Sequence, residues 1–247
     1  MKLILPSLTL AFLALWMIWC ASLPRFWRRI GARPAARFPV WRRVGERLEE
    51  ISRRERVAIP PRLWILPDFA PNALLLKRGR TLQVALTEGL LRALDDEELD
   101  AVLGLCLSHG LGERRRWQTA LSLQLFPFAR FLQGYPIAVQ IFLAPWLMAA
   151  LRLFSAPGRV IEADRRGAEG LIAAAALQKM AVLGRKIPLQ HWNLALDPLY
   201  LISPLALDGG PLWVFLSQPS VEERRLALMG VAESATYLDK ARAVCDK

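Results

Sequence analysis

Residues 95–110, which read DDEELDAVLGLCLSHG, constrain the fold of this chain more than any other stretch. Asp95 can cap a helix, and Glu98, three residues later, completes a capping box. Acidic residues fill the first turn, where the helix dipole favours them, and Gly110 stands at the exit. Four apolar residues recur at helical spacing and would face a core, namely Leu99, Val102, Leu103 and Cys106. We therefore predict a capped amphipathic helix at the centre of the fold.

The overall composition favours a membrane protein over a nucleic-acid-binding one. Hydrophobic residues make up 54% of the chain, and its net charge is +11, mostly from arginine. Soluble domains usually contain about 45–50% apolar residues. No helix-turn-helix spacing, zinc-finger pattern or aromatic RNA-binding signature accompanies the basic charge, and the arginine clusters flank apolar runs instead. We expect the bilayer, and no nucleic acid, to be a partner of this chain.

The first 24 residues predict an N-terminal transmembrane anchor. Residues 3–23 form an apolar run of spanning length, and an arginine-rich segment, residues 25–56, follows it. A cleaved signal peptide is the competing interpretation, but its positive charge would precede the apolar run, and no Ala-x-Ala-like site follows. The charge asymmetry predicts an integral membrane protein, in the inner membrane if the source is bacterial. Its main domain would be cytoplasmic, behind an arginine-rich juxtamembrane segment.

A second apolar feature predicts a helical hairpin over residues 117–154. Two apolar runs, residues 117–132 and 135–154, make up its arms, and arginines flank it on both sides. Both ends would then lie in the cytoplasm, whether the hairpin spans the bilayer or enters it only halfway. Because Arg130 and several prolines weaken the first run, a pair of helices buried in a soluble bundle stays open as the alternative.

Residues 57–247 predict one domain of the α+β class. Three short strands are expected, with a hairpin-like turn between the second and the third, at residues 63–66, 71–76 and 81–86. Helices are expected beside the central one, at residues 40–56, 88–94 and 162–184. Ser220 and Glu223 make a second capping box for a last helix. The result is a small sheet with a helix laid on it.

Taken in order, these landmarks resemble the HtpX-like family of membrane zinc metallopeptidases, which includes the prenyl-protein CAAX proteases. Residues 71–73 resemble the family's P-N-A strand, and residues 86–102 resemble its T-x-G-L-L…E-L-x-A-V approach to the metal helix. Ala163-Asp164 matches its A-D helix, and residues 217–224 resemble its T-H-P…E-R signature. The resemblance implies a mostly helical, gluzincin-like metallopeptidase domain with a small β-sheet.

The resemblance also implies a zinc site, and here the sequence departs from the family. Zinc peptidases of this type use two histidines at i and i+4 of a helix, a glutamate base and a third ligand. His109 keeps the second histidine position. The first histidine, the base, the third ligand and the histidine of T-H-P are replaced by Leu105, Cys106, Val160 and Gln218. We therefore expect no cofactor, with a substitute zinc site of Cys106, His109 and Glu162 as the alternative.

Other residues of the matched motifs have structural or binding interpretations. His109 is expected to be a hydrogen-bonded histidine in the core or at its rim. Asp164 and Arg224 are expected to be structural, with Asp164 held by a charge-assisted hydrogen bond. Asn72, Ala73 and Leu74 are expected to line a groove whose edge strand can pair with an extended peptide.

Three functions follow from these expectations. The first is a membrane-anchored pseudoprotease that keeps the peptidase fold and binds a protein or peptide partner. The family's role in protein quality control suggests, by resemblance, that this partner is a membrane protein or a peptide segment. The first alternative is an active zinc metalloendopeptidase with atypical ligands that acts on membrane proteins. The second is a structural subunit of a membrane assembly.

Overall fold

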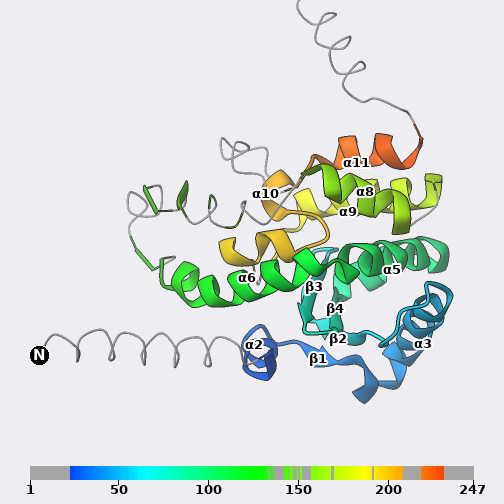
Figure 1. The fold of residues 1–247 in the computed structure, drawn as a ribbon, viewed down its shortest axis with the longest axis horizontal. Helices are drawn as coiled ribbons and strands as arrows, with labels where there is room; N and C mark the ends of the chain where they lie inside the picture. Colours follow the sequence, from blue (N-terminus) through cyan, green and yellow to red (C-terminus); the bar gives the residue numbers. More distant parts are fainter. Residues whose placement is uncertain are drawn as a thin grey trace, which may run out of the picture.

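The computed structural model describes residues 23–132, 134–135, 142–143, 145–146, 149, 151, 157–167, 170–190, 192–207 and 218–230. It has the predicted α+β class, because helices surround a small sheet (Figure 1). The predicted anchor, residues 1–24, lies outside the described residues except for its last two, which begin the first labelled helix.

The sheet has four strands in the order β1-β2-β4-β3. They are β1 (Arg33–Pro34), β2 (Arg62–Leu66), β3 (Ala73–Arg78) and β4 (Thr81–Thr87). β4 pairs in parallel with β2 and antiparallel with β3, and β1 pairs antiparallel with β2. The three predicted strands are confirmed. β1 was not predicted, since two residues leave no pattern of alternation in a sequence.

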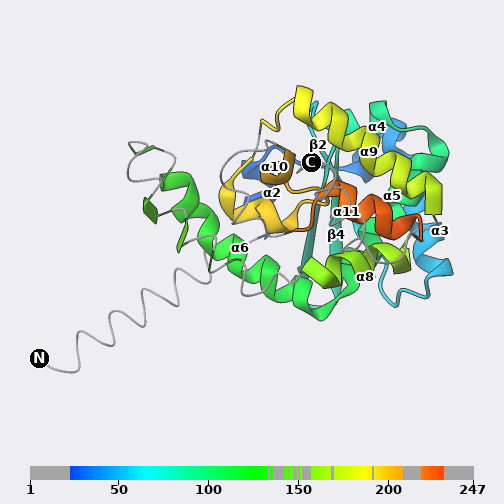
Figure 2. The ribbon, with the colours of Figure 1, turned by 90° about the horizontal axis from the view of Figure 1, so that it is seen from above.

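Helices cover both faces of the sheet, which extends the prediction of one helix on a sheet. One face packs against α3 (Pro39–Arg54), α5 (Asp96–Leu111) and α9 (Gly170–Lys186). The other packs against α2 (Leu23–Arg29), α6 (Glu113–Leu132) and the 3-10 helix η2 (Leu194–Leu199). Figure 2 shows the strands between these two groups. The remaining described elements are η1 (Ala35–Arg37), α4 (Glu88–Ala93), α8 (Pro157–Gly167), α10 (Pro204–Leu207) and α11 (Val221–Leu228).

Strand β3 shows how the alternation of side chains serves both layers. Ala73 and Leu75 join the cluster on the α5 side, whereas Leu74 and Leu76 join the cluster on the α6 side. Successive side chains of a strand point to opposite faces. A strand buried on both faces therefore reads as a continuous apolar run, which is why residues 73–76 of this strand carry no polar position.

The central helix α5 begins as its sequence predicts. Asp95 accepts a hydrogen bond from the backbone N–H of Glu98 at 2.8 Å, and the Glu98 side chain accepts one from the Asp95 N–H at 3.0 Å. Ser220 and Glu223 form the second predicted capping box, at the start of α11. Both boxes satisfy backbone donors that have no partner inside the helix.

The prediction of one helix over residues 162–184 is wrong, because two helices occupy this stretch. α8 ends at Gly167, and α9 begins at Gly170, where φ is +52°. A right-handed helix cannot run through such a residue, and glycine adopts this backbone conformation at little cost. Because of this break, α8 and α9 can both pack against α5.

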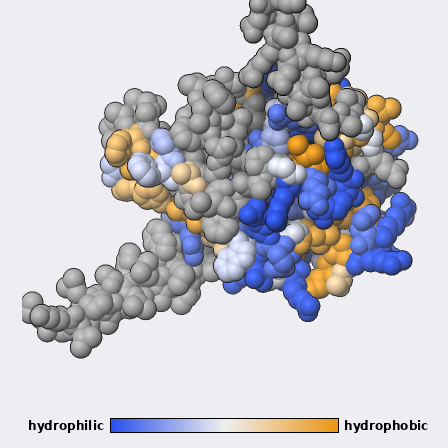
Figure 3. Space-filling model, turned by 45° about the horizontal axis from the view of Figure 1, so that its top comes forward, coloured by the Kyte–Doolittle hydropathy of each residue, from blue (hydrophilic) through white to orange (hydrophobic). Residues whose placement is uncertain are grey.

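The predicted apolar hairpin, residues 117–154, begins in α6, and its second arm lies mostly outside the described residues. Leu123, Phe126 and Ala129 of α6 are buried in the cluster beneath the sheet. Large apolar residues on and beyond the end of α6 are exposed, among them Phe131 and Trp146, and Figure 3 shows orange residues there. Within the residues described, no helix combines the length and the hydropathy needed to cross a membrane.

The contact between α5 and α8 predicts that Gly104→Ala destabilises the fold. A Cβ atom at Gly104 would lie 2.2 Å from the carbonyl oxygen of Gly167, so the two helices would have to separate. Overpacking of this kind costs roughly 1–3 kcal/mol. Urea unfolding should show the loss. Gly45→Ala is the matched control, because no atom lies within 4 Å of its Cβ position in α3 and alanine favours a helix. Equal stability of the two variants would contradict this account.

Candidate functional site

The end of α5 is joined to α8 and α11 by a buried cluster of charged and polar groups. Asp164 of α8 accepts two hydrogen bonds from Arg224 of α11, from Nε to Oδ2 and from Nη2 to Oδ1, each 2.7 Å long. The Nε2 atom of His109 lies 2.7 Å from the same Oδ1. Arg224 also donates from Nη1 to the Leu201 carbonyl at 2.6 Å. We call Asp164, Arg224 and His109 the buried triad.

The geometry of the triad assigns its protons. Arg224 is almost fully buried and Asp164 fully so, and the two form a bidentate ion pair. Burial lowers the pKa of His109, although Asp164 opposes the shift, so this imidazole is neutral at pH 7. Arg224 Nη2 lies 3.4 Å from His109 Nε2 and can only donate. The ionised Asp164 carboxylate can only accept, so the Nε2 atom must carry the imidazole proton and donate it to Asp164, which leaves Arg224 Nη2 no acceptor at Nε2.

The two residues of α5 at the positions of the motif's first histidine and base lie in the hydrophobic core. Leu105 and Cys106 are fully buried and pack with residues of α9 and the sheet. Burial raises the pKa of the Cys106 thiol to about 12, so sulfur stays protonated at pH 7. Val160 lies in the first turns of α8 and, like Leu105, offers no ligand atom.

These residues do not fit a zinc ion. Within the part of the chain that the structure describes, no three His, Cys, Asp or Glu side chains are close enough to hold a metal. The alternative set of Cys106, His109 and Glu162 is therefore not assembled, because Glu162 is exposed and pairs with Arg166 at 3.1 Å. His109 has also committed its Nε2 atom to Asp164.

The residues expected to line a peptide groove are bound to the chain itself, although Asn72 also borders a small pocket of about 80 Å³. Asn72 is buried, donates to the Ile202 carbonyl at 2.8 Å and accepts from the Ile202 N–H at 3.2 Å. Leu201 donates to the carbonyl of Ala73 at 2.8 Å, and Leu74 forms an isolated bridge with Tyr200. The edge of β3 at Ala73 and Leu74 is thus already occupied by residues 200–202, which a peptide would have to displace.

Gln218, which replaces the histidine of the family's T-H-P signature, also binds the segment of residues 200–203. Its side chain accepts from the Ser203 N–H at 3.2 Å and donates to the Tyr200 carbonyl at 2.7 Å. An amide both donates and accepts, as these two backbone groups require. Gln218 therefore anchors residues 200–203 and borders the space described next.

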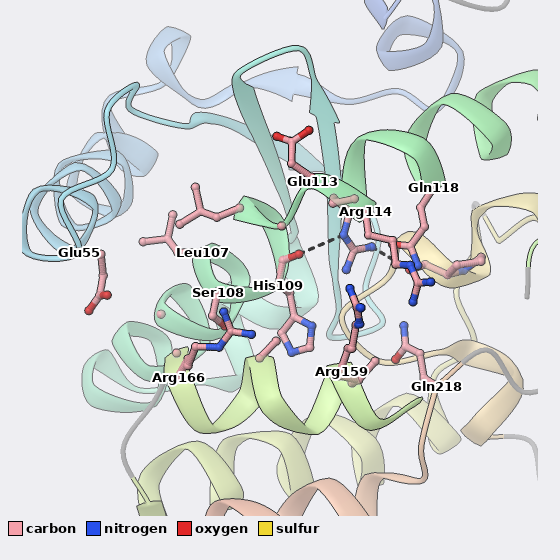
Figure 4. A pocket seen from close by; sticks show the side chains of 18 residues that line it. Glu55, Leu107, Ser108, His109, Glu113, Arg114, Gln118, Arg159, Arg166 and Gln218 are labelled. Carbon is pink, nitrogen blue, oxygen red and sulfur yellow. Dashed lines mark hydrogen bonds between the residues drawn. The ribbon is translucent and has the colours of Figure 1, made fainter. Parts of the chain in front are cut away.

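A cavity of about 510 Å³ opens beside the triad, between the end of α5, the start of α6 and α8. Figure 4 shows His109 and Arg159 reaching into this region from α5 and α8, with Gln218 beside them. Most of its charged lining residues are arginines, namely Arg114, Arg115, Arg159 and Arg166, against Glu55 and Glu113. Figure 3 shows hydrophilic residues over much of the visible side of the helical body.

Sequence reasoning missed this cavity. Residues 114–116 were interpreted as charges that flank a hairpin, and Arg159 as part of the flank at its other end. The signal available was the position of three arginines just after Gly112-Glu113, where α5 ends and α6 begins. Only the packing of α8 against α5 brings Arg159 to the same place.

Curated proteins with related sequences share one name. The chain is 31% identical over 197 residues to "Protease HtpX homolog" of Methylibium petroleiphilum, which covers 69% of this chain and 68% of that protein. It is 30% identical over 209 residues to the protein of that name from Dictyoglomus thermophilum, covering 73% and 66%. The one from Nostoc punctiforme is 30% identical over 202 residues, covering 71% and 69%. No family model and no solved structure matches the chain.

The burial of His109 predicts a pH dependence of stability between pH 7.5 and 5.5. Because the pKa of His109 is lowered in the folded chain, the unfolded chain binds a proton first as the pH falls below about 6.5. The free energy of unfolding then falls with pH, by up to about 1.4 kcal/mol per pH unit. Urea unfolding should show a smaller loss for His109→Gln than for the wild type. Equal losses in the two proteins would contradict the assignment of a neutral, buried histidine.

Proposed function

Because the chain belongs to the HtpX-like protease family, we propose that it is a catalytically inactive member that binds a protein or peptide partner. The observation that carries the proposal is the burial of Leu105 and Cys106 in the core, at the positions where the family's motif has a zinc ligand and the catalytic base.

The chemistry of hydrolysis supports the proposal. A catalytic zinc needs three protein ligands and an open position for water, and a base must take the proton of that water. Leu105 and Val160 carry no donor atom, and the Cys106 thiol is protonated and has no access to solvent. His109 alone remains of the motif, and it is bonded to Asp164. One histidine is not enough to hold a zinc ion or to activate water.

The cavity beside the triad is the site that we propose for the partner. The fold keeps this opening beside the end of α5, where the former metal motif runs, although the ligand positions are filled. Its volume of about 510 Å³ lies within the range of roughly 300–1,000 Å³ that is usual for small-molecule sites, so it admits one or two side chains or a chain end. A partner would therefore insert a short segment rather than lie along β3.

We also propose that the protein works at a membrane, with its main domain in the cytoplasm. The apolar run of residues 3–23 followed by arginines supports this proposal. A membrane-anchored binding protein of this kind would meet partners that are themselves membrane proteins or emerge from the membrane.

Measuring the zinc content of the purified protein tests the proposal that it is catalytically inactive. The purified full chain should contain far less than one zinc per molecule and should not hydrolyse peptides. Leu105→His, Cys106→Glu and Val160→Glu together should restore a ligand set and create stoichiometric zinc binding. Leu105→His alone is the control and should not. Stoichiometric zinc in the wild type, lost together with peptidase activity on chelation, would overturn the proposal in favour of an active endopeptidase.

Site-specific crosslinking tests partner binding at the cavity. A photoreactive amino acid in place of Glu55, an exposed cavity residue at the end of α3, should give discrete crosslinked products in cells. The same amino acid in place of Arg43, exposed on α3 and outside the cavity lining, should not. Identical products from both positions would refute the cavity as the binding site.

A further inference from the structure

The cavity is lined by more positive than negative side chains, and the replacement of the zinc-ligand positions does not explain this charge. Of the two glutamates in its lining, Glu113 is already bound by Lys77 at 3.2 Å and by Arg116 at 3.5 Å. Of the four arginines, only Arg166 has a carboxylate partner among the described residues. The cavity therefore carries an excess of positive charge that the described residues do not neutralise.

Arg115 is the most unusual of these groups, because it is buried with no carboxylate partner in the part of the chain that the structure describes. It donates from Nη1 to the carbonyl of Pro198 at 2.8 Å and from Nε to the carbonyl of His109 at 3.3 Å. A guanidinium group has five N–H donors, so three of them have no hydrogen-bond partner among the described residues. Burial, reinforced by Arg224, lowers the pKa of Arg115 to about 10, so it is still charged at pH 7. Buried charges in proteins are normally paired.

Arg159 lines the same cavity from α8, and it too has no carboxylate partner among the described residues. It lies in the first turns of α8, and no hydrogen bond or ion pair joins it to any described residue. Figure 4 shows its side chain directed toward the space beside His109 and Gln218. Two guanidinium groups, a buried one on α6 and an exposed one on α8, thus line the same cavity and give it positive charge.

We propose that this cavity binds an oxyanion, a carboxylate or a phosphate, through Arg115 and Arg159. Planar guanidinium groups bind both kinds of anion with two parallel hydrogen bonds, and they do so most strongly where water is excluded. The free donors of Arg115 supply the buried contact, and Arg159 closes the site from the rim. The oxyanion site depends on the function proposed above in one respect. If the partner is a protein, the anion would be the carboxylate at that partner's C-terminus.

Arg115 also has a structural role, which dictates how the site is tested. Its bonds to His109 and Pro198 join the end of α5 to η2, so removal of its side chain would disturb the fold. Arg159 makes no such contacts among the described residues. Arg159→Gln therefore removes charge from the cavity without breaking a bond of the fold, and Arg185→Gln removes an equal charge from an exposed turn of α9.

The test is calorimetric titration of the purified full chain in metal-free buffer. Sodium phosphate is one probe, and a pair of five-residue peptides that differ only in a free or an amidated C-terminus is the other. We expect saturable binding of at least one probe that carries an oxyanion, at least tenfold weaker in Arg159→Gln and within twofold of the wild type in Arg185→Gln. Arg115→Lys, which keeps the charge but loses the planar fork, should also bind more weakly while its melting temperature shows that it is folded.

The two probes identify the source of the anion, and each result decides one point. Preference for the free over the amidated peptide would assign the site to a protein C-terminus, and binding of phosphate alone would assign it to a free anion. No saturable binding of either, or equal weakening in Arg159→Gln and Arg185→Gln, would overturn the oxyanion site. Zinc-dependent hydrolysis in the separate metal assay would overturn the proposed function and leave this result standing.

Discussion

The arrangement of this fold depends on the ion pair between Asp164 and Arg224. Both side chains are removed from water, and the loss of either would leave the other charge buried, at a cost of about 3–5 kcal/mol. The pair links α8 to α11, and His109 adds α5. Arg224 also binds the carbonyl of Leu201, whose N–H binds Ala73 on the edge of the sheet. One buried charge pair therefore fixes three helices and closes the strand edge.

Under the proposed loss of zinc, the same contacts explain how the helix that carries the motif stays in place. In zinc sites a ligating histidine commonly donates its other ring N–H to a carboxylate, which fixes its orientation. Here Asp164 orients His109 through Nε2 itself, while Leu105 and Cys106 add apolar packing at the positions of the first ligand and the base. Leucine in a core contributes free energy through burial, about 1.5–3 kcal/mol for a large apolar side chain. Stability in this region thus comes from packing and from the ion pair.

Local signals predicted local structure, and tertiary contacts account for the rest. The start of α5 was predictable because Asp95 and Glu98 satisfy each other's backbone within one turn. The break between α8 and α9 depends on the left-handed backbone of Gly170, and the polar run of residues 164–170, which holds two glycines, marks it only weakly in the sequence. The family's motif located His109, Asp164 and Arg224. Their joining into one cluster, and the burial of Arg115, depend on packing between segments far apart in the sequence.

A zinc ion and a pair of guanidinium groups give a cavity the same sign of charge but different chemistry. Zinc accepts a lone pair from water or from a carbonyl and so lowers the barrier to hydrolysis. A guanidinium group only donates hydrogen bonds, and even with its pKa lowered to about 10, Arg115 keeps its proton at pH 7. It can therefore hold an anion that already exists, and it cannot activate water to cleave a neutral peptide bond. With His109 held by Asp164 and arginines around the opening, this cavity is suited to retaining a charged group.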